Sequence, residues 1–182
     1  AAGDFSQSYE GFSTDTRTVK AGNVFVALSG ERFDGHDFVV GAAEAGAVCA
    51  IVERKVDAAI TQIVVTDSGL AFGLAAKAWR GRFALPLAVV AGSNGKTTTK
   101  ELVSRVLAER FEVYATHGNL NNHIGVPLTL LAMTRDTEFG VVEMGASACG
   151  ELALLASVAE PNYGILTNIG LAHLEGFGGP EG

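Results

Sequence analysis

The feature that most constrains this chain of 182 residues is a short segment near its middle, which reads VVAGSNGKTT over residues 89–98. Its first three residues are apolar and mostly β-branched, as in a buried strand. The glycines that follow permit a turn in which the backbone approaches another group closely. Gly-Lys-Thr then opens a segment with helical spacing, so the chain passes from strand to loop to helix within a few residues.

This order of elements is typical of a loop that holds phosphate, because backbone N–H groups and a helix N-terminus converge on one anion. The Lys96 ammonium would balance charge between β- and γ-phosphates, and the Thr97 hydroxyl would reach Mg²⁺. The general pattern has glycine five positions before Gly95, where this chain has Val90. The alternative is that this segment is only a strand-to-helix turn with a capped helix and binds no nucleotide. The order of strand, loop and helix favours the phosphate loop over that alternative. The nucleotide-binding residues predicted are Gly92, Ser93, Asn94, Gly95, Lys96, Thr97 and Thr98.

Apolar strand-like runs alternate with helical segments on both sides of this loop. The strands predicted are Val24–Leu28, Val48–Val52, Ile63–Val65, Leu87–Ala91, Phe111–Ala115, Phe139–Met144 and Tyr163–Ile169. The helices predicted are Phe38–Ala45, Leu70–Arg80, Thr98–Glu109, Val126–Ala132 and Glu151–Val158. Such alternation predicts an α/β fold, with a mostly parallel sheet covered by helices on both faces in the second half.

A basic segment punctuated by glycine and proline, Gly81–Pro86, interrupts this alternation. We place a domain boundary there. Residues 1–83 are predicted to form a small α/β domain. Residues 84–182 are predicted to form part of a phosphate-loop domain.

The composition limits the classes of partner that the chain is expected to bind. Twenty acidic residues against 13 basic ones give a net charge of −7, which disfavours a nucleic-acid coat or an anionic membrane surface. No apolar run approaches the ~20 residues that cross a bilayer. Residues 1–9 lack the pattern of a signal peptide. Cys49 and Cys149 are far apart and predict free thiols, as in a reducing, cytosolic protein.

Three polar groups follow later strands and should reach the same edge of the sheet. Glu143 ends an apolar strand, where phosphate-loop enzymes hold Mg²⁺, although a solvated glutamate is the commoner case for such a position alone. His173 follows the last strand and could bind a cation, or could be a packed histidine. Asn121 and Asn122 lie in a Gly/Asn-rich turn, and spacing alone does not decide whether their amides touch phosphate or substrate.

Several blocks in order resemble the ATP-dependent Mur ligases of bacterial cell-wall synthesis: GSNGKTTTKE, GNLNNHIGVPLTLL, VVEMGASACGE and NIGLAHLEGFG. The earlier block STDTRTVKAGNVFVALSGERFDGHDF resembles the UDP-substrate domain of that family, so the resemblance runs from about Ser13 to Gly182. It implies that ATP phosphorylates a peptide carboxylate and that an amine then displaces phosphate from the acyl phosphate. The second and fourth blocks favour the ligases that join D-Ala-D-Ala to UDP-MurNAc-tripeptide.

The resemblance also implies roles for individual residues. The catalytic residues would be Lys96, Glu143 and His173, and the Mg²⁺ ligands Thr97, Glu143 and His173. ATP would bind at residues 92–98. The UDP-substrate would contact Thr16 and Arg17, with further substrate candidates at Asp34, His36, Asn121 and Asn122. For Asp34 and His36 a structural turn is an equal alternative.

Residues 1–83 would then bind the UDP-MurNAc-peptide, and residues 84–182 would form an incomplete ATP-binding domain. His123 stands where many relatives have an acidic residue. The family's carbamylated lysine and carboxy-terminal domain would lie beyond Gly182, so we expect no ligase activity from residues 1–182. A ligase for the third amino acid and a nucleotide-dependent switch are the alternatives. A cytosolic monomer without nucleic-acid or membrane partners is expected.

Overall fold

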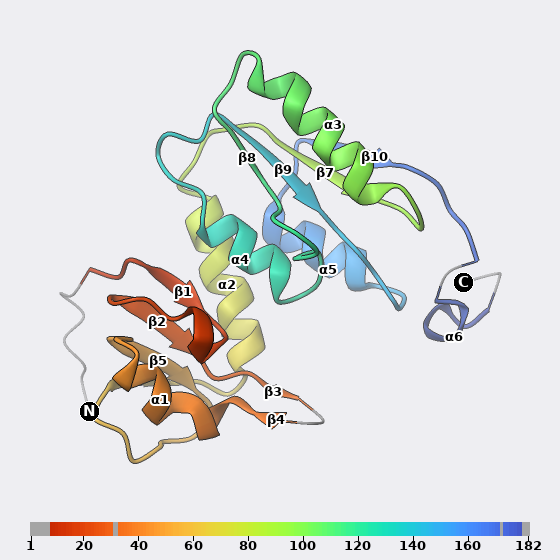
Figure 1. Ribbon diagram of the computed structural model, residues 1–182. Helices are drawn as coiled ribbons and strands as arrows, with labels where there is room; N and C mark the ends of the chain where they lie inside the picture. Colours follow the sequence, from red (N-terminus) through yellow and green to blue (C-terminus); the bar gives the residue numbers. More distant parts are fainter. Residues whose placement is uncertain (1–7, 31–32, 172, 180–182) are drawn as a thin grey trace. The chain divides into compact units, whose positions relative to one another are not determined.

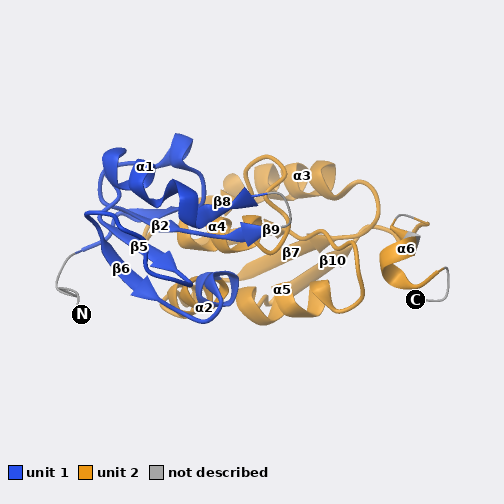
Figure 2. Cartoon of the chain, turned by 90° about the horizontal axis from the view of Figure 1, so that it is seen from below, with its two compact units in different colours: residues 1–72 blue, residues 73–182 orange. Residues whose placement is uncertain are grey.

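The computed structural model describes residues 8–30, 33–171 and 173–179. The chain forms two compact units, residues 1–72 and 73–182 (Figure 2). The division falls inside helix α2 (Ser68–Arg80) and not in the Gly81–Pro86 segment. It falls there because the second half of α2 packs within the second unit, where Trp79 Nε1 donates a hydrogen bond to the carbonyl of Met133 at 3.0 Å.

The first unit contains a parallel sheet of four strands in the order β1-β2-β5-β6. These strands are β1 (Gly11–Ser13), β2 (Asn23–Val26), β5 (Cys49–Val52) and β6 (Thr61–Val64). Every residue of β2 and β5 is buried, which explains why, apart from Asn23, their sequences are apolar without alternation. The remaining elements are the 3₁₀ turns η1 (Thr16–Thr18) and η2 (Gly35–Phe38), helix α1 (Val39–Glu44) and the hairpin β3 (Ser29–Gly30) and β4 (Phe33–Asp34).

The second unit contains another parallel sheet, in the order β10-β7-β9-β8. Its strands are β7 (Leu87–Ala91), β8 (Val113–Ala115), β9 (Phe139–Glu143) and β10 (Tyr163–Leu166). Its helices after α2 are α3 (Lys96–Ala108), α4 (Gly125–Leu131), α5 (Glu151–Ala159) and the short α6 (Leu174–Phe177). The α/β class and the parallel sheets predicted from the sequence are confirmed.

Helices cover the two faces of this second sheet unequally. Figure 1 shows α3 on one face and α4 and α5 on the other. The second face is a continuous core in which Ala76 of α2, Leu130 of α4 and Leu155 of α5 meet Leu87 and Val142 of the strands. This core fixes β7 in the interior of the sheet, between β9 and β10.

The α3 face is covered less completely than the sequence predicts. Leu102 and Val106 of α3 are 60% and 72% exposed, although their spacing suggested one buried helix face. They line an apolar groove of about 510 Å³ with Tyr163 and Ile165 of β10. In the described residues, α3 packs on β8, β9 and β7, so the part of this face beside β10 stays open.

A buried arginine ties the end of α2 to the second unit. Arg80 is 6% exposed, and its guanidinium donates hydrogen bonds to the carbonyls of Ala159 (3.2 Å), Phe83 (2.9 Å) and Leu85 (3.2 Å). Burial lowers the pKa of Arg80 from its usual value, because the charged form is desolvated. The three carbonyls offset part of that cost.

Replacing Arg80 by methionine should therefore destabilise the chain, because three carbonyls would lose their donor while the apolar stem is kept. We expect the free energy of unfolding, measured in urea, to fall by about 3 kcal/mol. The matched control is Arg82→Met, since Arg82 is exposed and lies over the Trp79 ring at 5.2 Å. That control should change the free energy by less than about 1 kcal/mol. Equal losses in the two variants would refute the role given to Arg80.

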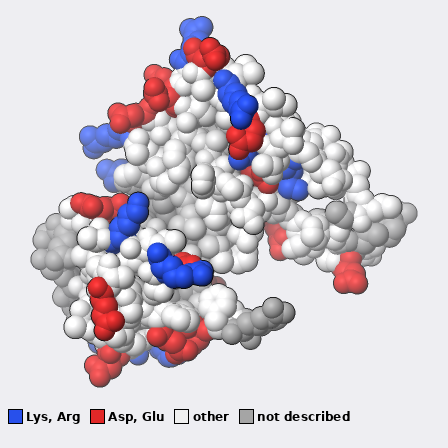
Figure 3. All heavy atoms as spheres, in the orientation of Figure 1, with Lys and Arg blue, Asp and Glu red and all other residues white. Residues whose placement is uncertain are grey.

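The charged side chains and the two cysteines are arranged as the composition suggests. On the face drawn in Figure 3, basic and acidic side chains lie interspersed. Both cysteines are free thiols, Cys49 buried and Cys149 exposed, as the sequence predicts. Among the described residues, every helix is too short or too polar to cross a bilayer.

Candidate nucleotide and substrate sites

The second unit gathers its polar residues where the parallel strands end. Val90 of β7 is in register with Glu143 of β9 on one side and with Ile165 of β10 on the other. The loops that follow these three strands therefore leave the sheet side by side, at an edge that we call the carboxyl edge. In open parallel sheets this edge is where ligands bind.

The loop after β7 has the backbone of a phosphate loop. Gly92 and Gly95 have φ angles of +134° and +77°, values that residues with a side chain rarely adopt. Helix α3 begins at Lys96, two residues earlier than predicted. Its N-cap residue is Gly95, which has no side chain to accept a hydrogen bond from the first turn. The N–H groups of the first turn have no partner within a helix, so this turn presents free donors and the positive end of the helix dipole.

Lys96 folds back over this loop. Its ammonium donates hydrogen bonds to the carbonyls of Gly92 (2.7 Å) and Ser93 (3.2 Å). These bonds hold the positive charge above the first turn of α3. Thr97 and Thr98, the next two predicted residues, are exposed in that turn.

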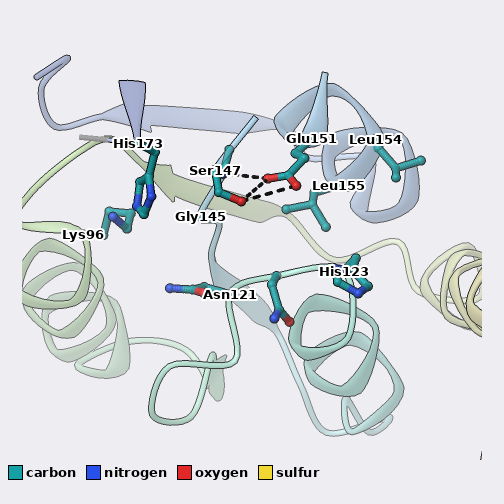
Figure 4. Close-up of a pocket in the computed structure, with 11 residues that line it drawn as sticks. Lys96, Asn121, His123, Gly145, Ser147, Glu151, Leu154, Leu155 and His173 are labelled. Atoms are coloured by element: carbon teal, nitrogen blue, oxygen red, sulfur yellow. Dashed lines mark hydrogen bonds between the residues drawn. The ribbon is translucent and has the colours of Figure 1, made fainter. Parts of the chain in front are cut away.

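His173 lies beside Lys96, as predicted. Figure 4 shows the two side chains pointing toward each other at one end of a pocket of about 400 Å³. His173 has φ +59°, an uncommon value for a residue with a side chain. A second cavity of about 550 Å³ shares Lys96, Ala146 and His173 and has an apolar wall that includes Leu166 and Ile169. Lys96 and His173 thus border both cavities.

The far side of the first pocket is formed by the start of α5. The Glu151 carboxylate accepts hydrogen bonds from the N–H groups of Ser147 (2.6 Å) and Ala148 (3.3 Å), drawn in part in Figure 4. The bond from the Ser147 N–H lowers the pKa of Glu151 from its usual value. Glu151 therefore orders the loop after β9. His123, the residue that departs from the family pattern, also lines this pocket.

Glu143, at the end of β9, is 1% exposed and is linked to the pocket through Asn121, which lines it. Its N–H donates to Thr116 Oγ1 at 2.9 Å, and its Oε1 accepts a hydrogen bond from Asn121 Nδ2 at 2.8 Å. Oε2 is buried without a hydrogen-bond partner among the described residues. An unpaired buried carboxylate oxygen is costly, and a cation would offset that cost.

This donor set fits magnesium. Mg²⁺ is usually held by one or two carboxylates together with phosphate oxygens and waters. In the described residues no three histidine, cysteine or carboxylate side chains gather as a metal cage. A single carboxylate beside a phosphate loop meets the needs of Mg²⁺ bound with a nucleotide, whereas it would hold a structural zinc ion poorly.

The two asparagines predicted from the Gly/Asn-rich turn act differently. Asn121 faces the pocket in Figure 4 and orients Glu143 through the bond described above. Asn122 Oδ1 accepts hydrogen bonds from the N–H groups of Ile124 (3.1 Å) and Gly125 (2.9 Å), so it caps the start of α4. Both asparagines line the first pocket, but Asn121 orients Glu143 whereas Asn122 also caps a helix.

The first unit has a pocket of its own, of about 400 Å³, lined by Thr16 and Arg17 together with Phe33 and Phe38. Arg17 Nε donates to both oxygens of Asp15, at 2.9 and 3.0 Å. The Arg17 guanidinium lowers the pKa of Asp15 to about 2. With a side chain 87% exposed, Arg17 keeps part of its donor fork open to solvent.

Asp34 and His36 are engaged within the fold. Asp34 Oδ1 accepts hydrogen bonds from the backbone N–H and from Nδ1 of His36, at 3.0 and 2.5 Å, and these bonds lower the pKa of Asp34. His36 is 2% exposed, and its Nε2 accepts the N–H of Glu53 at 2.8 Å. The proton of the neutral ring therefore sits on Nδ1. These contacts favour the structural-turn alternative for both residues.

Several residues at the carboxyl edge were missed from the sequence. Thr167, Asn168 and Gly170, after β10, are hydrogen-bonded to the phosphate loop. Lys100 of α3 is 1% exposed and donates to the carbonyl of Thr116 at 2.7 Å. Residues 167–169 fell inside the predicted strand Tyr163–Ile169, which ends at Leu166 in the structure, so the pattern did not mark them as a loop. For Lys100 the pattern gave no sign of burial, because most lysines on helices are solvated.

Fold and site together define the class of protein: a phosphate-loop α/β domain preceded by a smaller α/β unit. Residues 90–182 match the family model "Mur ligase middle domain", and residues 8–78 match "Mur ligase family, catalytic domain". These matches span most of the chain. The chain belongs to the Mur ligase family.

Curated relatives agree with this assignment. The chain is 45% identical to the UDP-N-acetylmuramoyl-tripeptide–D-alanyl-D-alanine ligase of Bacillus subtilis over 94% of its own length and 38% of that protein. It is also 45% identical to the ligase of the same name from Escherichia coli, over 93% of its own length and 38% of the relative. The chain thus spans less than half the length of these relatives.

Solved structures agree as well. A crystal structure of MurF from Acinetobacter baumannii superposes with a TM-score of 0.90 at 40% identity, over 97% of this chain and 39% of that one. MurF from Thermotoga maritima, solved in complex with ADP, gives a TM-score of 0.81 at 39% identity, over 90% of this chain and 38% of that one.

Proposed function

We propose that this chain belongs to an ATP-dependent ligase that joins D-Ala-D-Ala to UDP-MurNAc-tripeptide, forming ADP and phosphate by way of an acyl phosphate. The observation that carries this proposal is the phosphate loop at the carboxyl edge, together with Glu143 Oε2, which is buried without a hydrogen-bond partner in the part of the chain that the structure describes. The names of the relatives and the ADP complex of the Thermotoga protein support it. In this proposal the enzyme acts as a monomer in the cytosol.

The second unit would bind ATP and Mg²⁺. Residues 92–98 would hold the phosphates through the first turn of α3, and Lys96 would leave the carbonyls of its own loop to meet them. Thr97 and Glu143 would hold Mg²⁺, and His173 would face a second cation nearer the substrate. ATP and Mg²⁺ supply the phosphoryl group and the charge that offsets repulsion between carboxylate and phosphates.

The first unit would bind the UDP part of the substrate, within the domain that we assign to residues 1–83. Arg17 is suited to a diphosphate because its guanidinium forms bidentate, charge-assisted bonds. Phe33 and Phe38 are 55% and 47% exposed beside it, which gives the same pocket apolar surface. Asp15 holds the Arg17 side chain at this pocket before substrate arrives.

The direct test is phosphate release by the full-length enzyme with ATP and Mg²⁺. We expect turnover with UDP-MurNAc-tripeptide plus D-Ala-D-Ala, and none when either is left out. Turnover only with UDP-MurNAc-dipeptide plus a diamino acid would identify a ligase for the third residue instead. Nucleotide binding without turnover of either pair would identify a switch.

A further inference from the structure

Three residues of the segment that follows β10, Thr167, Asn168 and Gly170, are hydrogen-bonded to the phosphate loop. Asn168 is central to it. Its carbonyl accepts the N–H of Ser93 at 3.0 Å, and its Oδ1 accepts the N–H of Asn94 at 3.1 Å. Its Nδ2 donates to the carbonyl of Asn94, also at 3.1 Å. One side chain thus binds both backbone groups of Asn94, which lies two residues before Lys96.

The neighbours of Asn168 continue the contact. Thr167 Oγ1 donates to the carbonyl of Asn94 at 2.7 Å, and the N–H of Gly170 donates to Ser93 Oγ at 2.8 Å. The approach is closest at Gly92, where a Cβ atom would lie 2.2 Å from Thr167 Oγ1. The loop can therefore take this path only with glycine at position 92, and residues 167–170 form one wall of it.

These bonds determine which donors the loop offers to a phosphate. Asn168 engages the N–H groups of Ser93 and Asn94, while the N–H groups of Gly95 through Thr98 stay at the open first turn of α3. The segment also leads within three residues to His173. The loop that carries Lys96 and the segment that carries His173 are thus joined into one framework.

We propose that Asn168 is a positioning residue for nucleotide binding: it holds the phosphate loop so that the first turn of α3 and Lys96 face the phosphates. This inference rests on the proposed function, because it assumes that the loop binds a nucleotide. Asn168 acts through the loop backbone.

The chain offers a close structural control at the other end of the same pair of strands. Asn162 precedes β10, and its Oδ1 accepts the N–H of Leu87 at 2.9 Å, while its own N–H donates to the Leu87 carbonyl at 2.8 Å. Both asparagines are exposed and both join β10 to β7. Only Asn168 lies at the carboxyl edge.

The experiment measures ADP binding to the full-length enzyme with Mg²⁺ by isothermal titration, alongside steady-state kinetics. Asn168→Ala should raise the dissociation constant of ADP and the KM for ATP about tenfold, because two side-chain bonds to the loop are lost. The KM for the UDP-substrate should change less than about twofold, since its pocket lies in the first unit. Asn162→Ala should change all three constants less than about twofold.

A second variant keeps the test decisive if the alanine protein folds poorly. Asn168→Asp keeps an acceptor for the Asn94 N–H, loses the Nδ2 donor and places negative charge beside the loop. It should bind ADP more weakly than the alanine variant, and the difference should grow at low ionic strength. Unchanged ADP binding in both Asn168 variants would overturn the inference. Absence of ADP binding in the unmodified enzyme would overturn the proposed function, and this inference with it.

Discussion

Lys96→Ala in the full-length enzyme should lower kcat by about 10³-fold or more while leaving the melting temperature nearly unchanged. Among the described residues, the hydrogen bonds of the Lys96 ammonium go to two carbonyls of its own loop, at 2.7 and 3.2 Å, so its removal should cost the fold little. In the proposed reaction a carboxylate that attacks a triphosphate meets like charge, and the Lys96 ammonium would stabilise that charge. Phosphate release measures the loss, and calorimetry measures the melting temperature.

The matched control for this variant is Lys77→Ala. Lys77 is also a helical lysine, and it donates to the carbonyl of Ser157 at 2.8 Å and pairs with Glu160 at 3.0 Å on the surface. A surface pair of this kind contributes about 0–1 kcal/mol to stability, so the control should keep its activity. If Lys96→Ala retained normal turnover, the phosphate loop would not be the site of the chemistry.

Glu143→Gln should have the second largest effect. It should lower kcat without lowering the melting temperature. We expect kcat to fall by about 10²-fold or more, because the amide lacks the charge that would hold Mg²⁺ in the proposed site. Without metal or nucleotide, the melting temperature should stay the same or rise. The reason is that Oε2 is buried without a partner among the described residues, and a neutral group is less costly to desolvate. The amide oxygen can still accept the bond from Asn121.

The control for this second variant lies next to the opposite end of the same strand. Glu138 precedes β9 and its Oε2 accepts the N–H of Glu112 at 2.9 Å, away from the carboxyl edge. Glu138→Gln should leave both kcat and the Mg²⁺ dependence unchanged. A Glu143→Gln enzyme with the same Mg²⁺ requirement as the unmodified one would exclude this carboxylate as the metal ligand.

Much of the fold could be predicted because its long strands are buried on both faces. β7 lies where predicted, at Leu87–Ala91, and β9 ends one residue before the predicted limit of Met144. The strand β1 and the hairpin of β3 and β4 were not predicted, because two or three residues carry no periodicity. β1 exists through its pairing with β2, and β3 and β4 exist through their pairing with each other.

The candidate site could be predicted only in part, for a related reason. Lys96 and His173 follow strands, and parallel pairing brings strand ends to one edge. The contacts that shape the loop are different in kind, since Asn168 and Asn94 are 74 residues apart and no local pattern links them. Lys100 was invisible because burial of its ammonium depends on the carbonyl of Thr116, which only the folded sheet supplies.

The bonds between the phosphate loop and the segment after β10 also bear on the order of events during synthesis. Gly170 lies 77 residues after Ser93, so the ribosome finishes the loop roughly 4–15 s before its partner at ordinary rates of elongation. Until β10 emerges and pairs with β7, Asn168 and Thr167 do not hold the loop. The nascent chain should therefore not acquire its full affinity for nucleotide before β10 docks on β7. Bound nucleotide would then stabilise the docked strand by mass action.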